Sequence, residues 1–257
     1  MLELNKISKV YESGSVNESA IFNDFNLQVK DGEFVTVVGS NGSGKTTLLN
    51  LICGSIPLDQ GEIILNDQNL TKMPEYKRSR RIGRVFQDPA KGTCPHLSIM
   101  ENMSIADNKT KRFNLERGVD LRRKSYYRER LAELGMGLED HMEQTCGTLS
   151  GGQRQALALL MSTLTPLELL ILDEHTAALD PKSSEIVMEL TNKIVQQSKV
   201  TTLMVTHNLR FALEYGDRML MMHEGAALMD ESGASKEALV MDDLLNAFYS
   251  ISIEYGN

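Results

Sequence analysis

Apolar and polar side chains alternate near the start of the chain, over residues 2–7 and again over residues 25–29. Because successive residues of a strand face opposite sides of a sheet, this period of two predicts strands with one buried face. A nearly continuous apolar run at 34–38 follows a turn signal at 31–32 and predicts a buried strand. Residues 2–39 are therefore expected to form strands.

The spacing of apolar residues becomes helical further along. Leucines within residues 46–52 recur at helical spacing, and Gly54 follows as a C-terminal cap. Residues 90–165 have mainly helical patterns, which stop before Pro166. Strand patterns return, with helical segments between them, at 169–172, 202–205 and 218–222. This alternation predicts an α/β fold with a mostly parallel sheet.

The composition is that of a globular protein. With 257 residues, of which 41 % are apolar, the chain can bury one sizeable core and a smaller subdomain. The longest apolar stretch, 157–172, is interrupted by polar residues and Pro166, whereas a bilayer-spanning helix needs about 20 mostly apolar residues. We therefore expect no transmembrane segment and no secretory signal. The three cysteines form no CxxC pair, which favours reduced thiols and a cytoplasmic location.

The charge balance argues against a nucleic-acid partner. The net charge is -8, whereas nucleic-acid binding depends on clustered cations that neutralise phosphates. One segment, 111–130, departs from this balance, with eight basic residues against three acidic ones. Two interpretations are open for it: a solvated helix face, or a surface close to anionic lipid headgroups or a membrane partner.

A glycine-rich loop after the strand at 34–38 carries the first candidate chemistry. It matches the GxxxxGK[ST] phosphate-binding pattern in full, with Gly39, Ser40, Asn41, Gly42, Ser43, Gly44, Lys45 and Thr46. Glycines let backbone N–H groups converge on phosphate oxygens, and the following helix directs its positive end at them. Lys45 is then expected to reach the outer phosphates and Thr46 to ligate Mg²⁺, with Thr47 also at the nucleotide. The loop predicts ATP and Mg²⁺ as ligands.

The second candidate chemistry lies at an apolar strand that ends in two acidic residues. Asp173 and Glu174 directly follow the run Leu169–Leu172. Because successive strand residues face opposite ways, the two carboxylates can serve different functions. We expect Asp173 to hold Mg²⁺ and Glu174 to be the general base that orients the attacking water.

The residues Ser150, Gly151, Gly152 and Gln153 follow Leu149 and precede a helical pattern extending to about Leu164. Ser150 and the glycine amides can cap this helix, whose N-terminus can receive a phosphate. Here the chain resembles the ATP-binding cassette family, in which this signature lies between the phosphate loop and the acidic strand. In that family the phosphate belongs to ATP held by a second subunit. The resemblance extends from Tyr11 to about Asp230.

The resemblance implies roles for further residues. Tyr11 is similar to the aromatic residue that stacks on adenine, and Gln87 to the glutamine that touches Mg²⁺ and links nucleotide to the helical subdomain. Asp180 resembles the loop that crosses the dimer interface, and His207 the histidine that contacts the γ-phosphate. The implied catalytic residues are Glu174, His207 and Gln87.

The implied fold is a P-loop NTPase core with an antiparallel β subdomain and a helical signature subdomain. We expect one domain, 1–257, with a nucleotide-binding core over 1–89 and 166–240. The helical subdomain would be 90–165, and a C-terminal helical tail would be 235–257. One departure concerns His175, since the family usually has proline after the glutamate. This histidine is expected either to alter the backbone path near Glu174 or to lie at the surface.

The resemblance also implies partners. One phosphate loop and one signature require a second copy, and membrane permease subunits would supply the transport path. Residues 143–148 do not resemble the element common in exporters, which favours an importer with an extracytoplasmic substrate-binding protein. The chain would then lie peripherally on the cytoplasmic face of the membrane. The residues around His175 resemble a subgroup that imports small nutrients, such as aromatic amino acids. An exporter subunit and a regulator of cell-wall or cell-division machinery remain open alternatives.

Residues 95–100 contain a mixture of apolar and polar residues just after Gln87. In the family, a short cytoplasmic helix of the permease docks at the corresponding place. We therefore expect a docking surface that includes Pro95, His96, Leu97, Ile99 and Met100. The alternative is that the apolar residues of this segment pack inside the helical subdomain.

Overall fold

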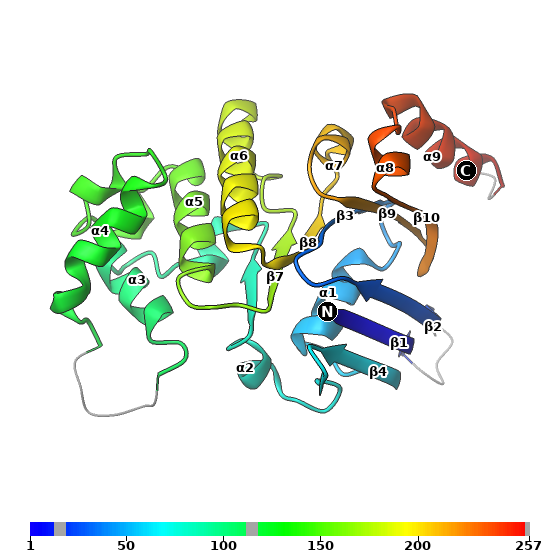
Figure 1. Cartoon of the computed structure of the whole chain (residues 1–257), viewed down its shortest axis with the longest axis horizontal. Coiled ribbons are helices and arrows are strands. Elements are labelled where there is room, and N and C mark those ends of the chain that lie inside the picture. The colour runs from blue at the N-terminus through cyan, green and yellow to red at the C-terminus, as the bar shows by residue number, and fades with distance from the viewer. Residues whose placement is uncertain (13–18, 112–117, 255–257) are drawn as a thin grey trace. The chain divides into compact units, whose positions relative to one another are not determined.

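The structure is a computed structural model that describes residues 1–12, 19–111 and 118–254 (Figure 1). The chain divides into two compact units. The first consists of Met1–Ser79 and Lys199–Asn257, and the second of Arg80–Ser198. In the part of the chain that the structure describes, no helix has the length and apolar character needed to span a membrane.

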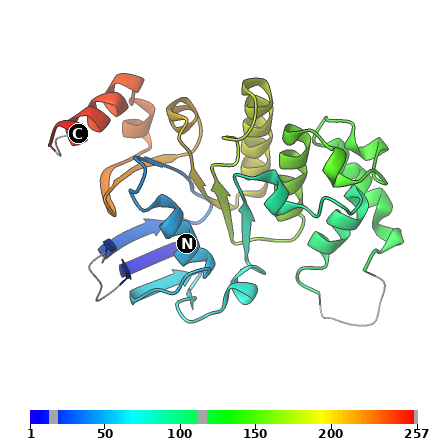
Figure 2. The same ribbon diagram turned by 180° about the vertical axis from the view of Figure 1, so that it is seen from behind.

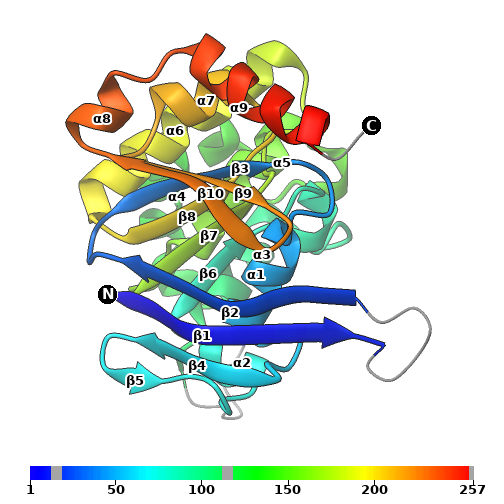
Figure 3. The same cartoon turned by 90° about the vertical axis from the view of Figure 1, so that its right-hand side faces the viewer.

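The first unit contains an antiparallel sheet. Its strands lie side by side in the order β2-β1-β4-β5 (Figure 3). They are β1 (Leu2–Tyr11), β2 (Ser19–Val29), β4 (Gln60–Leu65) and β5 (Gln68–Asn69). Leu4 of β1 pairs with Leu27 on one side and with Ile63 on the other, and all three side chains are buried. This is the apolar face that the alternation of the first residues predicts.

A second sheet in the same unit has β3 (Phe34–Gly39) parallel to both β8 (Thr201–Val205) and β9 (Arg218–His223). Strand β10 (Ala226–Ser232) pairs with β9 in the antiparallel sense. Every residue of β3 is buried, as expected of a strand covered on both faces. Because β3 and β8 are parallel, their carboxyl ends lie at the same edge of the sheet.

Five helices of the described residues belong to this unit: α1 (Lys45–Cys53), α2 (Glu75–Arg78), α7 (Leu209–Glu214), α8 (Ala234–Glu237) and α9 (Met241–Glu254). Ala212 of α7 and Leu244 of α9 pack in one core cluster with Met219 and Met221 of β9. The helix predicted over 46–52 is α1, and Gly54 caps it in the left-handed conformation with its N–H bonded to Asn50 O. The C-terminal residues described are thus packed on the sheet of the first unit.

The second unit pairs β6 (Ile82–Val85) with β7 (Leu169–Asp173) in parallel, so these strands also share a carboxyl edge. Its α-helices are α3 (Ile99–Asp107), α4 (Lys124–Ala132), α5 (Gly151–Ser162) and α6 (Pro181–Ser198), with short 3₁₀ turns between them. Helices α3, α4 and α5 gather together (Figure 2). They share one core, in which Tyr127, Leu131 and Leu157 are almost fully buried.

The predicted α/β class, with mostly parallel pairing and a separate antiparallel sheet, is confirmed. Three strands lack a clear signal in the sequence. β6 has four residues and includes a glycine and Arg84, while β10 is largely exposed and has no apolar periodicity. β4 begins with three exposed polar or glycine positions. The helix expected to reach Leu164 ends at Ser162, where the hydroxyl of Thr163 donates to Leu159 O and Leu160 O.

Six of the eight basic residues of segment 111–130 are described by the structure, and these six lie beside carboxylates. Arg112 and Arg117 are outside the described residues. The six others each form an ion pair within the second unit: Lys111 and Arg123 with Asp107, Arg122 with Asp120, Lys124 with Glu143, Arg128 with Asp140, and Arg130 with Glu133. Because neighbouring acids neutralise these cations, the structure favours the solvated helix face over an anionic-lipid surface.

Candidate functional site

The loop at 39–46 joins the carboxyl end of β3 to the start of α1. Gly42 and Gly44 have φ of 81° and 98°, a left-handed conformation that glycine adopts without steric cost. A Cβ added at Gly44 would lie 2.9 Å from Phe22 Cζ, so the loop has no room for a side chain there. Gly44 is also the N-cap of α1, and it provides no side-chain cap. The first amide groups of α1, which lack intrahelical acceptors, are therefore available to an anion.

Lys45 is the cation of this loop. Its side chain is bent back so that Nζ donates to Gly39 O and Ser40 O, both at 2.8 Å. The residue is only 5 % exposed, so its ammonium group is surrounded by the loop's own backbone. Ser43 is buried as well, whereas Asn41 and Thr46 are exposed. A buried ammonium group next to a helix start without a side-chain cap suits a polyphosphate.

The structure brings His207 to the same sheet edge. Thr206 N donates to Val37 O at 3.1 Å, immediately after the end of β8, and His207 follows with an exposed side chain. The phosphate loop starts two residues after Val37. Thr47, on the first turn of α1, is half-buried.

Tyr11 is at the end of β1, in the antiparallel sheet, and is 39 % exposed. The ammonium group of Lys9 lies 5.6 Å from the centroid of its ring. Lys9 Nζ in turn donates to Asp59 Oδ1 at 2.8 Å, and Val10 N donates to Asp59 Oδ2 at 2.8 Å. These hydrogen bonds, chiefly that from Lys9, lower the pKa of the Asp59 carboxyl group. Tyr11 therefore has an accessible ring with a cation held beside it.

In the second unit, Gln87 and the acidic pair share a sheet edge. Val85 of β6 pairs with Leu172 of β7, so Gln87 and Asp173 follow the carboxyl ends of adjacent parallel strands. The side chain of Gln87 is exposed, while Asp173 and Glu174 are half-buried. Glu174 has a φ of 49°, which is uncommon for a residue with a side chain.

A cation that the sequence analysis did not single out contacts Asp173. Arg84 Nη2 donates to Asp173 Oδ2 at 2.7 Å, and the side chains are 15 % and 13 % exposed. The Arg84 guanidinium group also stacks on Phe86, 4.8 Å from the ring centroid. An arginine within the short apolar strand at 82–85 was the available signal, because a charged residue in a buried strand needs a partner.

His175 is 1 % exposed, so the expectation of a surface position is wrong. Its Nε2 lies 3.0 Å from Thr191 Oγ1 on α6. Burial lowers the pKa of this histidine to about 4, and the imidazole is neutral at physiological pH.

The signature residues form the start of α5. Ser150 is the N-cap and accepts from Gln153 N at 3.2 Å, while Gln153 Oε1 accepts from Ser150 N at 3.2 Å, a complete capping box. Gly152 is buried, and a Cβ added there would lie 3.0 Å from Ser183 Cβ. Gly151 is exposed at the first position of the helix. Gly152 thus allows α6 to approach the start of α5 closely.

Two further contacts involve the surroundings of α5. Gln155, fully buried on α5, donates from Nε2 to Phe86 O at 3.0 Å, beside Gln87. Asp180 is exposed just before α6 and accepts from Ser183 N at 3.1 Å. Hydrogen bonds with Ser183 lower the pKa of the Asp180 carboxyl group. The candidate residues of the second unit therefore belong to one packed group of elements.

The candidate residues fall into the two units. Tyr11, loop 39–47 and His207 belong to the first, and the others belong to the second: Gln87, Ser150 to Gln153, Asp173, Glu174 and Asp180. Within the described residues, no group of three or more His, Cys, Asp or Glu side chains could hold a metal ion. Thr46 in the first unit and Gln87 and Asp173 in the second carry side-chain oxygens of the kind that bind Mg²⁺ together with substrate phosphates and water.

Comparisons with known proteins agree with these features. The family model for "ABC transporter" matches residues 22–177. A tyrosine transport ATP-binding protein of Clostridioides difficile is 46 % identical over 249 residues, covering 96 % of this chain and 98 % of that protein. The spermidine/putrescine import ATP-binding protein PotA of Mycoplasma mycoides is 34 % identical over 227 residues, covering 88 % of this chain and 59 % of that protein.

Solved structures show the same fold. A dimeric ATP-binding cassette in a post-hydrolysis state, bound to ADP and Pi, has a TM-score of 0.76 and 27 % identity, with 90 % of this chain and 98 % of that chain covered. A nucleotide-free cassette from an ABC transporter has a TM-score of 0.80 at 20 % identity, with 100 % and 99 % covered, and supports the fold alone. The chain belongs to the ABC transporter family, as an ATP-binding and ATP-hydrolysing importer subunit that acts on ATP with Mg²⁺.

Proposed function

We propose that the phosphate loop, the acidic strand end and the signature of this chain carry out the ATP hydrolysis that drives this importer. The phosphate loop carries the proposal, because Lys45 is held inside a loop whose helix N-terminus has no side-chain cap. Lys45 and the loop amides bind the phosphates, Tyr11 stacks on adenine, and His207 contacts the γ-phosphate. Thr46, Gln87 and Asp173 hold Mg²⁺, which supplies charge neutralisation for the phosphates.

Glu174 is proposed as the general base. It directly follows β7 and is half-buried, at the first position of the turn after the strand. It would orient the attacking water and accept its proton as the terminal phosphate is cleaved. Loss of such a base lowers turnover by roughly a hundredfold or more.

The active assembly is proposed to be a homodimer. Ser150 and the following glycines present a helix N-terminus, which can receive a phosphate from the second copy. Asp180 and Gly151 are exposed in the same unit, at positions where the family resemblance implies an interface. The dimeric cassette described above supports this arrangement. Each site would then use the phosphate loop of one copy and the signature of the other.

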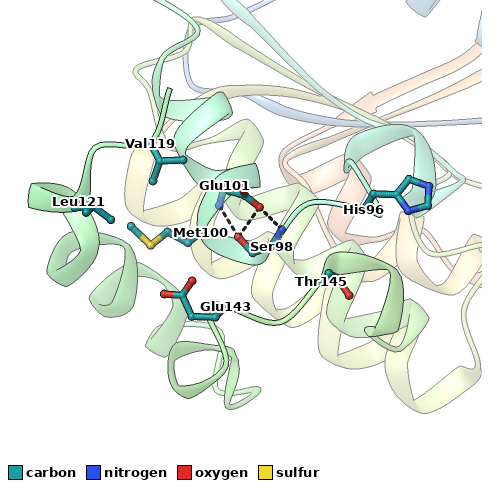
Figure 4. A pocket seen from close by; sticks show the side chains of 8 residues that line it. All are labelled: His96, Ser98, Met100, Glu101, Val119, Leu121, Glu143 and Thr145. Carbon is teal, nitrogen blue, oxygen red and sulfur yellow. Dashed lines mark hydrogen bonds between the residues drawn. The ribbon is translucent and has the colours of Figure 1, made fainter. Parts of the chain in front are cut away.

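A surface pocket of the second unit is the proposed docking place for a permease. It has a volume of about 330 Å³ and includes His96, Met100, Leu121 and Glu143 in its lining. His96 lies at one end, Val119 and Leu121 lie at the other, and the Ser98–Glu101 capping box lies between them (Figure 4). Leu121 is 64 % exposed, so an apolar side chain is available to a partner helix.

The expected docking surface needs one correction. Ile99 and Met100 are 0 % and 2 % exposed and belong to the core shared by α3, α4 and α5. Both therefore pack inside the helical subdomain, because α3 places them on its buried face. Pro95 and His96 are exposed, and Leu97 is half-buried. The docking surface is proposed to comprise His96, Val119 and Leu121 around the pocket.

The transported substrate is proposed to be an aromatic amino acid, delivered by an extracytoplasmic binding protein. The near full-length match to a tyrosine transport ATP-binding protein supports this assignment. The chain itself would work peripherally at the cytoplasmic face of the membrane. Reconstitution with the permease and binding protein tests the substrate assignment: tyrosine should stimulate ATP hydrolysis, while spermidine should not. Stimulation by spermidine alone would contradict the substrate assignment.

The hydrolytic site is tested by Glu174→Gln. This variant should bind ATP as tightly as the unmodified chain, turn over roughly a hundredfold more slowly, and dimerise in ATP. Turnover near the unmodified rate would show that another group orients the water.

A further inference from the structure

We propose that His175 is a positioning residue for Glu174, holding the turn that carries this carboxylate through a buried hydrogen bond to Thr191 of α6. The inference rests on the proposed function, in which Glu174 is the general base. It concerns the position where the family usually has proline, whose ring restricts the backbone φ. A buried side-chain anchor takes over that restraint in this chain.

The turn after β7 needs an external restraint. Glu174 has a φ of 49°, in the left-handed region that costs roughly 1–2 kcal/mol for a residue with a side chain. A backbone hydrogen bond from Ala177 N to Glu174 O, at 2.9 Å, closes the start of the turn. Strained backbone persists where surrounding contacts determine it, so the neighbours of Glu174 must supply that restraint.

The hydrogen-bond chain defines the protonation of His175. Thr191 Oγ1 lies 2.7 Å from Val187 O and donates its single proton to that carbonyl. The same hydroxyl oxygen can therefore only accept from His175 Nε2, 3.0 Å away. The imidazole is the tautomer that carries its proton on Nε2. Both residues are almost completely buried, at 1 % and 0 % exposed, so water does not compete for the bond.

A second hydrogen bond joins the same turn to the same helix. Ser184 Oγ donates to Thr176 O at 3.1 Å, and Ser184 is buried. Ser184 and Thr191 are seven residues apart, so they lie two turns apart on one face of α6. His175 and Thr176, the two residues after Glu174, are thus each attached to this face. The turn and α6 should move as one body.

This attachment has a consequence for catalysis. α6 begins at Pro181, directly after Asp180, which is proposed to face the second copy. A shift of the helix start on dimer closure would reach Glu174 through His175 and Thr176. Misplacing a reacting group by about 1 Å can cost a hundredfold in rate, so a loosened turn would lower kcat.

The test compares His175→Leu and Thr191→Val, which remove the donor and the acceptor, with His175→Gln, which keeps a donor at a similar reach. ATP affinity by nucleotide titration, kcat and KM for ATP, and thermal unfolding are measured for each. His175→Leu and Thr191→Val should each lower kcat about tenfold with ATP affinity unchanged, and the double variant should be no worse. His175→Gln should recover most of kcat.

Val195→Ala is the matched control, because Val195 is 2 % exposed on α6 and its side chain forms no hydrogen bond. It should lower thermal stability but leave kcat per folded molecule unchanged. A kcat near the unmodified value in both His175→Leu and Thr191→Val would overturn the proposal, as would equal losses of kcat in Val195→Ala. Glu174→Gln distinguishes the two assignments. If this variant retains turnover, Glu174 is not the general base. If it is inactive while the His175 variants have a normal kcat, only the positioning role of His175 fails.

Discussion

Arg84 donates a 2.7 Å hydrogen bond to Asp173, the carboxylate proposed to hold Mg²⁺. Both residues lie on neighbouring parallel strands of the second unit, and Phe86 stacks against the guanidinium group. Asp173 therefore has a cationic partner from its own unit before any metal ion binds. This pair gives the carboxylate a fixed orientation, and a Mg²⁺ ion held there would compete with Arg84 for it.

We predict that Arg84→Met destabilises the nucleotide-free protein. Removing the cation leaves a largely buried carboxylate without its partner, which should lower the free energy of unfolding by about 2–3 kcal/mol, less than the loss for a fully buried pair. Urea unfolding measures this. The double change Arg84→Met with Asp173→Asn should regain most of the stability, and equal stability of Arg84→Met and the unmodified chain would contradict the prediction.

Lys45→Ala should weaken ATP binding by about ten- to a hundredfold. Charge-assisted hydrogen bonds are worth about 1.5–3 kcal/mol each, and the loop loses its ammonium group. Nucleotide titration of the purified protein measures the affinity. Lys30→Ala is the control, because Lys30 is exposed just before β3, whereas the phosphate loop begins at the other end of that strand. Unchanged affinity in Lys45→Ala would refute the phosphate-loop assignment.

The Lys9–Asp59 pair should give the stability a dependence on acid pH. Hydrogen bonds from Lys9 and Val10 lower the pKa of Asp59 below 3.8, so the folded state favours the ionised form. The resulting stability is present above pH 3.8 and is lost as pH falls through the lower folded pKa. Asp59→Asn should cost about 1 kcal/mol at pH 7, because this carboxylate is partly exposed. Urea unfolding should show the difference shrinking below about pH 4, and a difference independent of pH would contradict the assignment.

The cysteines should differ sharply in reactivity. Cys94 is exposed, whereas burial raises the pKa of Cys146 to about 11, so its reactive thiolate is scarce at neutral pH. Cys53 is also buried. A disulfide-exchange reagent should therefore label only Cys94 rapidly in the native protein, and all three cysteines in denaturant. Cys94→Ser should remove the fast phase, and two thiols reacting equally fast would be the contrary result.

A charge at the docking pocket should uncouple transport from hydrolysis. Leu121→Glu places a carboxylate at an exposed apolar site, so basal hydrolysis should persist while stimulation by permease and binding protein is lost. Met100→Glu should instead unfold the second unit, because Met100 is in its core. Crosslinking of His96→Cys to the permease gives the direct measurement. An active complex that forms no crosslink from His96→Cys or from Leu121→Cys would show that docking occurs elsewhere.

Much of the fold was predictable because its signals are local. The alternation at 2–7, the buried run at 34–38 and the leucines of 46–52 each reflect contacts within one element. β6 and β10 were not predictable in this way. β6 is four residues long and carries Arg84, while β10 is largely exposed, so their strand pairing depends on a neighbour elsewhere in the chain.

The sequence by itself determined the phosphate loop, the acidic strand end and the signature, because each is a contiguous pattern whose chemistry follows from residue type and spacing. Tertiary structure alone decided the partners of these residues. Arg84 and Asp173 are 89 residues apart, and His175 and Thr191 are 16 apart, so strand pairing and helix packing bring them together. The burial of Met100 was likewise settled by the packing of α3, since a mixed segment can face either a core or a partner.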